Sequence, residues 1–221
     1  MNLNFLKTQF FLITALAVAS ASTASAQTYQ VTIQNLTQSQ VFNEIFTKVH
    51  GSQEHIFQTG SLLSDSIASL FFPNTIFPAV IKAPHLNLVP GGSVSFEVSG
   101  RRRQKFFSLF STLHATDDGF VGIDSVRLPS KRNPVITVEA NAYDAGLFDN
   151  TESCDATTSL TSLNPPEECS QELKEVILQP KKPVVVHNGI HGVGDLSPAQ
   201  YDWKNPVAQI TIKIKRNPKG K

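Results

Sequence analysis

Short stretches in which apolar and polar residues alternate dominate this chain. In residues 28–34, Tyr29, Val31 and Ile33 fall on one face, and threonine and glutamine residues occupy the other. A period of two residues is typical of a β-strand that buries one face and leaves the other in water. By the same criterion, strands are expected at residues 93–100, 105–115, 119–128, 134–140 and 206–216.

One stretch shows helical spacing instead. Between residues 60 and 73, apolar residues recur every three or four positions and Pro73 lies just past the last of them, which predicts a helix. A second short helix or turn is expected near residues 197–199, and residues 172–178 fit either a strand or a helix. Because short strands joined by Gly, Pro and Asn turns outnumber helices, the predicted fold class is all-β. The expected architecture is an antiparallel β-sandwich with one or two short helices in its connections.

Residues 1–26 are predicted to be a signal peptide and not part of the fold. An apolar run at residues 10–19 is too short to span a bilayer, and Ala-Ser-Ala before Gln27 is the small-x-small pattern of a cleavage site. We expect cleavage before Gln27; an uncleaved anchor is the alternative. The mature chain would then hold one domain at residues 27–216 and a disordered tail at residues 217–221. Such a protein is expected to be secreted or periplasmic.

Charge adds little to this picture. Nineteen Lys and Arg residues and 18 Asp and Glu residues give a net charge of +1, which argues against a dedicated nucleic-acid binder. The basic cluster at residues 101–103 is interpreted as a solvated turn between strands. After the signal peptide, no apolar stretch is long enough for a membrane helix. We therefore expect no nucleic-acid partner, no membrane span in the mature protein, and a monomer.

The chain has two cysteines, Cys154 and Cys169. In an exported protein, two cysteines favour one disulfide. It would close a loop of about 15 residues and stabilise the fold by roughly 3 kcal/mol in the chain-entropy model. Redox-active pairs are normally closer in sequence, as in Cys-x-x-Cys, so the prediction is a structural bridge.

His187, His191 and Asp195 follow one another at intervals of four residues, the spacing of metal ligands on one face of a helix. Three glycines inside this span disfavour a helix by about 1 kcal/mol each. The segment is therefore interpreted as a glycine-rich loop, held by hydrogen bonds, that follows a strand at residues 183–187. No other catalytic motif stands out, so we predict that the protein is not an enzyme. The alternative is a secreted metal-dependent hydrolase that uses these three residues.

Several motifs occur in an order that resembles the spondin domain, the N-terminal domain of F-spondin and mindin. They are "YQVTIQNLT", "DDGFVGIDSVRLP", "AYDAG" and "GIHGVGDLSPAQYDWKNPVAQITI". The resemblance extends over about residues 29–215. The similarity is strongest to stand-alone bacterial versions of this domain. The resemblance implies an antiparallel β-sandwich similar to C2 domains, a calcium ion at one end, and no catalytic activity. In animals the domain is a matrix and cell-surface interaction module.

The resemblance also implies the calcium ligands. Asp118 and Asp144 match two aspartates of the family, but Phe148 occupies the place of the third and cannot coordinate an ion. Asp149, one residue further on, is the expected substitute. Reserve ligands are Asp117 and Glu152. We thus expect an exported, calcium-binding module for adhesion or for matrix or envelope association, whose partner is an unknown protein or glycan surface ligand.

Overall fold

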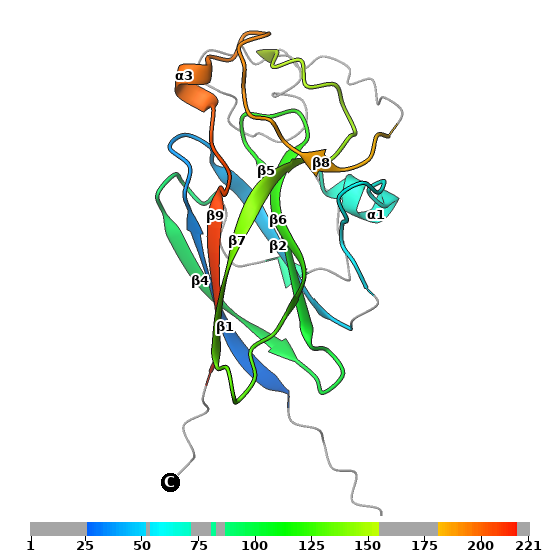
Figure 1. Ribbon diagram of the computed structural model, residues 1–221, viewed down its shortest axis with the longest axis vertical. Helices are drawn as coiled ribbons and strands as arrows, with labels where there is room; N and C mark the ends of the chain where they lie inside the picture. Colours follow the sequence, from blue (N-terminus) through cyan, green and yellow to red (C-terminus); the bar gives the residue numbers. More distant parts are fainter. Residues whose placement is uncertain (1–25, 52–53, 72–80, 83–86, 155–180, 216–221) are drawn as a thin grey trace, which may run out of the picture.

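The computed structural model describes residues 26–51, 54–71, 81–82, 87–154 and 181–215. Its regular structure is almost entirely β-strand (Figure 1). The strands are β1 (Gln27–Asn35), β2 (Phe42–His50), β3 (Ile81–Lys82), β4 (Ser93–Gly100), β5 (Phe106–Leu113), β6 (Gly119–Arg127), β7 (Val135–Asp144), β8 (Val185–Val186) and β9 (Ala208–Ile214). The helical segments are α1 (Asp65–Ala68), the 3-10 helix η1 (Ser69–Phe71) and α3 (Pro198–Tyr201).

All strand pairs among the described residues are antiparallel, in the order β3-β2-β5-β6-β7-β9-β1-β4, with β8 beside β7. Strand β7 belongs to both layers. Its residues 135–140 pair with β9, whereas residues 141–144 pair with β6. The sheet therefore folds over on itself at β7, and the predicted all-β antiparallel sandwich is confirmed.

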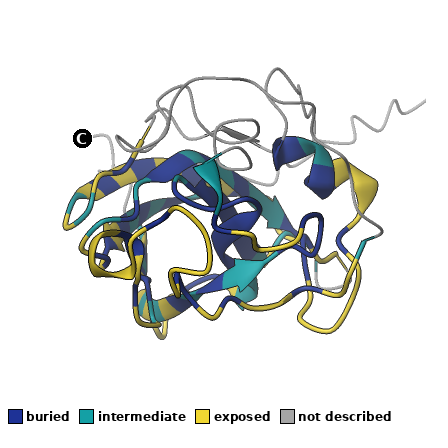
Figure 2. Ribbon diagram, turned by 90° about the horizontal axis from the view of Figure 1, so that it is seen from above, coloured by how far each residue is buried: buried dark blue, intermediate teal, exposed yellow. Residues whose placement is uncertain are grey.

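The main core lies between the two layers. Val31 and Ile33 of β1 and Ile210 and Ile212 of β9 are at most 1% exposed. Seen from above, buried residues line the space between the layers, and exposed residues lie mainly in the surrounding loops (Figure 2). The faces predicted from alternation in β1 and β9 are thus the ones that the sandwich buries.

A second core covers the outer face of β5 and β6, so these two strands are buried on both sides. Phe71 of η1 packs edge-on against Phe110 of β5 at a ring distance of 5.2 Å. The predicted helix at residues 60–73 is confirmed in position but begins later, because in the described part of this stretch, residues 60–71, only α1 and η1 are helical. Ser64 caps α1 by accepting a bond from the Ile67 N–H.

Strand β2 was not predicted, and a bulge explains why. Residues 43 and 44 of β2 face a single residue of β5, since Phe42 pairs with Leu113 and Ile45 with Ser111. The extra residue shifts the alternation by one position. Apolar residues then fall at intervals of three and four, a spacing that looks helical in the sequence.

Several predictions fall partly or wholly outside the described residues. The signal peptide up to residue 25, the tail at residues 217–221, the segment at residues 172–178 and Cys169 lie there. Cys154 is not a free thiol in the structure, but its pairing with Cys169 remains a prediction. Where the structure describes the chain, no helix has the length and apolar character needed to cross a membrane.

Candidate metal centre

The predicted calcium ligands lie at the upper end of the sandwich in Figure 1, where β6 begins and β7 ends. Gly119 pairs with Asp144 in the β6–β7 ladder, and Ala145 donates to the Asp118 carbonyl at 3.2 Å. Strand pairing thus places Asp118 directly beside Asp144. These two residues are 26 positions apart in the sequence, and antiparallel pairing of the strands brings them together.

Asp118 is fully buried, with 0% of its surface exposed. Its Oδ2 accepts hydrogen bonds from the backbone N–H groups of Leu147 (2.6 Å) and Phe148 (3.0 Å). Its Oδ1 is buried and has no hydrogen-bond partner in the structure. A buried carboxylate oxygen without a partner has lost its hydration and gained nothing in return.

Asp117 repeats this arrangement. It is 3% exposed, and its Oδ2 accepts a bond from the Thr151 N–H at 3.2 Å. Its Oδ1 is also buried without a partner. Two successive buried carboxylates with one unpaired oxygen each are unusual, because buried polar atoms are nearly always hydrogen-bonded.

The electrostatics follow from this burial. Burial, and then the negative charge of Asp144, raise the pKa of Asp118 to about 7. Burial raises the pKa of Asp117 to about 6 despite its bonds to Thr151. Both carboxylates are therefore costly to ionise in the folded chain, and a cation bound next to them would offset that cost.

Asp144 and Asp149 have partners of their own. Asp144 accepts from the Gly146 N–H at 2.7 Å and from the Asn150 amide at 2.6 Å. Asp149 is exposed, and its carboxylate pairs with the Lys182 ammonium at 2.5 Å. The pKa of Lys182 is raised by Asp149 first and also by Asp144 and Asp118. The Lys182 charge therefore lies close to Asp118, Asp144 and Asp149, which are called the acidic group below.

Lys182 was missed by the sequence analysis. No local pattern connects it with Asp149, which is 33 positions earlier. The contact arises because the Lys182 N–H donates to the Gly146 carbonyl at 2.7 Å, which fixes the two segments side by side.

Glu152, one of the reserve ligands, is 6% exposed and has a positive φ of 53°. Its Oε1 accepts from the His191 N–H at 2.7 Å, and its Oε2 from the N–H groups of Gly192 (2.6 Å) and Val193 (3.0 Å). Three backbone donors thus occupy this carboxylate. Glu152 links the glycine-rich loop to the loop at residues 145–152. Because its oxygens already accept hydrogen bonds, it is a weaker candidate cation ligand than Asp117.

The segment from His187 to Asp195 is a loop, as predicted. Gly189 and Gly192 have φ values of 98° and 75°, which strain any residue with a side chain. A Cβ on Gly189 would also lie 2.2 Å from the Asp202 carboxylate. The glycines are therefore required by the loop conformation.

His187, His191 and Asp195 have separate surroundings. His187 is buried, accepts from the Gly189 N–H at 3.0 Å, and packs against the Trp203 ring at 4.9 Å. Burial lowers the pKa of His187, so its ring is kept neutral. His191 is exposed at the surface, and Asp195 accepts from the Cys154 N–H at 3.0 Å.

The acidic group is not a preassembled ligand set. Within the described residues, no three His, Cys, Asp or Glu side chains are grouped closely enough to hold a metal ion. A small cavity of about 10 Å³ does adjoin Asp117, which is space for about one water-sized particle. Its walls are Thr116, Asp117, Asn150, Glu152, His187, Ile190 and Leu196. The residues fit a hard cation through their unpaired oxygens, provided that the loop at residues 145–152 adjusts around it.

Comparison with models of protein families gives no match for this chain, and comparison with curated proteins gives none either. The resemblance to the spondin domain thus has no support from these comparisons. What can be said of the function comes from the acidic end of the sandwich and from the motifs in the sequence.

Proposed function

We propose that this protein is an exported, calcium-binding β-sandwich module of the spondin type that serves adhesion or association with a matrix or envelope surface. The observation that supports the proposal most strongly is the pair of buried, unpaired oxygens on Asp117 and Asp118. The motifs in the sequence that resemble the spondin domain point to the same end of the fold.

Calcium matches the chemistry of this group. It takes six to eight oxygen ligands, from carboxylates, backbone carbonyls and water, in a flexible geometry. Asp118 and Asp144 would hold the ion, with Asp117 as a third carboxylate. Asp149 would join them after leaving Lys182. When bound, the ion would neutralise the carboxylates and fix the loops around them as a surface for a partner.

Lys182 is expected to compete with calcium, because its ammonium already lies beside the acidic group. Lys182→Ala should therefore increase calcium affinity, roughly three- to tenfold for one like charge removed near the surface. Isothermal titration calorimetry measures this directly. Lys181→Ala is the matched control, since Lys181 pairs with Asp65 instead. Unchanged or weaker calcium binding by Lys182→Ala would contradict this role.

Calcium binding itself is tested by thermal unfolding. A ligand of the native state raises the melting temperature, by about 5–10 °C at a hundredfold excess over its Kd for a domain of this size. Asp118→Asn and Asp144→Asn should each remove most of that rise. Asp65→Asn is the control: it removes the same charge from an exposed site, and calcium should still raise its melting temperature as in the parent.

The proposal fails if millimolar calcium leaves the melting temperature of the parent unchanged and calorimetry detects no binding. The adhesive role is tested by retention of the mature chain on isolated cell envelope. We expect calcium to increase retention, and chelator to reduce it to the level that Asp118→Asn shows with calcium.

A further inference from the structure

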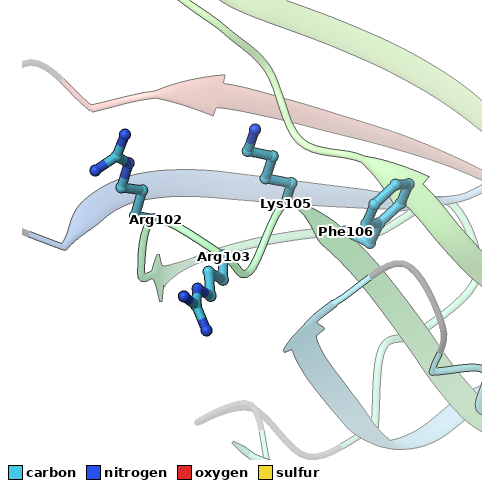
Figure 3. Close-up of a pocket in the computed structure, with 4 residues that line it drawn as sticks. All are labelled: Arg102, Arg103, Lys105 and Phe106. Atoms are coloured by element: carbon cyan, nitrogen blue, oxygen red, sulfur yellow. The ribbon is translucent and has the colours of Figure 1, made fainter.

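The end of the sandwich opposite the candidate metal centre has a hollow of about 580 Å³ with cationic walls. Arg102, Arg103, Lys105 and Phe106 line it. In Figure 3, Arg102 and Lys105 project to the same side of the turn between β4 and β5, and Arg103 projects to the other. The hollow is open to solvent, which suits an extended ligand better than an enclosed small molecule.

Strand pairing adds a second basic loop to this end. Phe106 at the start of β5 pairs with Arg127 at the end of β6, and the Leu128 N–H donates to the Lys105 carbonyl at 2.8 Å. The connection from β6 to β7 therefore starts beside the β4–β5 turn. It carries Lys131 and Arg132, both exposed.

These cations are not neutralised locally. Among the described residues, none of the ion pairs involves Arg102, Arg103 or Lys105. The nearby acids on the β2 side of this end are already paired, Glu54 with Lys48 at 2.8 Å and Asp124 with His55 at 2.5 Å.

The charges of the chain are thus separated along the sandwich. Strand β6 has nine residues, so its two ends lie roughly 27 Å apart. Asp118 precedes one end and Arg127 forms the other. The net charge of +1 hides an acidic upper end and a basic lower end.

We propose that this basic end binds an anionic polysaccharide, through a surface separate from the candidate calcium site. Arginine and lysine side chains across two adjacent loops can contact successive carboxylate, sulfate or phosphate groups of an extended chain. The ring of Phe106 in the hollow gives an apolar surface for the C–H face of a sugar. Residues 101–103 form the exposed turn that the sequence predicted, and the proposal adds a binding role to that turn.

Other polyanions fit less well. Between the β4–β5 turn and residues 128–135, Val135 is the one exposed large apolar side chain among the described residues. A single valine offers little apolar surface for insertion between lipids. Among the described residues, Phe106 is the single aromatic residue lining the hollow, and it is half-buried. Proteins that bind single-stranded nucleic acids stack successive bases on several aromatic rings.

The test measures binding of the mature chain to immobilised dextran sulfate and polygalacturonate, with neutral dextran as the blank. We expect binding to at least one anionic polymer that weakens steeply with salt. The Arg102→Ala, Lys105→Ala double variant should bind about tenfold more weakly. Lys181→Ala with Lys204→Ala removes the same charge elsewhere on the surface and should change binding less than about twofold. Swapping the pair, as Arg102→Lys with Lys105→Arg, keeps both charges and should restore most of the affinity.

Chelator should leave this binding unchanged, so its outcome is independent of the calcium proposal. The inference is overturned if neither polymer binds, if the control double variant weakens binding as much, or if chelator abolishes it. Tighter binding to phosphatidylglycerol vesicles or to double-stranded DNA than to either polysaccharide would also overturn it. Circular dichroism of each variant confirms that the exposed substitutions leave the fold intact.

Discussion

Phe120→Ala is expected to lower the free energy of unfolding by about 3–5 kcal/mol. Phe120 is fully buried in the second core, with ring distances of 4.6 Å to Phe110, 5.0 Å to Phe57 and 5.4 Å to Tyr143. Removing the ring leaves a cavity among rigid aromatic neighbours that cannot collapse into it. Urea denaturation monitored by circular dichroism measures the loss.

Phe46→Ala is the matched control, because Phe46 packs against the same cluster but is only partly buried. Its expected cost is about 1–2 kcal/mol. Phe120→Ala should also weaken the thermal shift caused by calcium, since Leu147 and Phe148 of the same cluster donate to Asp118. A loss for Phe120→Ala no larger than the roughly 1–2 kcal/mol expected for Phe46→Ala would contradict the prediction.

In chelator at pH 8, Asp118→Asn is expected to be more stable than the parent by ~3 kcal/mol, and near pH 4 the two should be equally stable. The pKa of Asp118 is raised to about 7 from an ordinary value of 3.8. Between these values the folded chain keeps a proton that the unfolded chain has lost. The parent is therefore destabilised as the pH rises through this window, whereas asparagine mimics the protonated acid at every pH.

The comparison is made between the two proteins at each pH, by urea denaturation. Burial lowers the pKa of His187, so that residue destabilises the folded state as the pH falls below 6.5. Both proteins share this effect, and it cancels when their free energies of unfolding are subtracted. Calcium should remove the advantage of Asp118→Asn at pH 8, because the ion stabilises the charged carboxylate. If Asp118→Asn were less stable than the parent at pH 8 in chelator, the ionised Asp118 carboxylate would not be destabilising the fold.

Local patterns in the sequence were enough to locate most of the strands. Strand β4 coincides with the predicted residues 93–100, and in β1 and β9 the alternation identified the buried face. This works because successive side chains of a strand point to opposite sides, so burial of one face is recorded directly in the order of residues. The pattern failed at β2, where the bulge introduced one extra residue.

For the candidate site, the motifs pointed to Asp118 and Asp144, and the pairing of β6 with β7 placed them side by side. Sequence could not reveal that Asp117 and Asp118 each bury an unpaired oxygen, because burial depends on how the loops at residues 145–152 and 187–196 close over them. The sequence also could not show that Asp149 forms an ion pair with Lys182.

The sequence by itself determined the fold class, the strand faces and the glycine-rich character of the loop around His187, since each depends on residues close together in the chain. The tertiary structure decided what depends on distant segments meeting. It tied Glu152 to the amides of residues 191–193, placed Lys182 beside the acidic group, and set two basic loops together at the opposite end. Net charge does not say where the charged residues lie in space. Only the pairing of strands could show that acidic and basic residues gather at opposite ends of the sandwich.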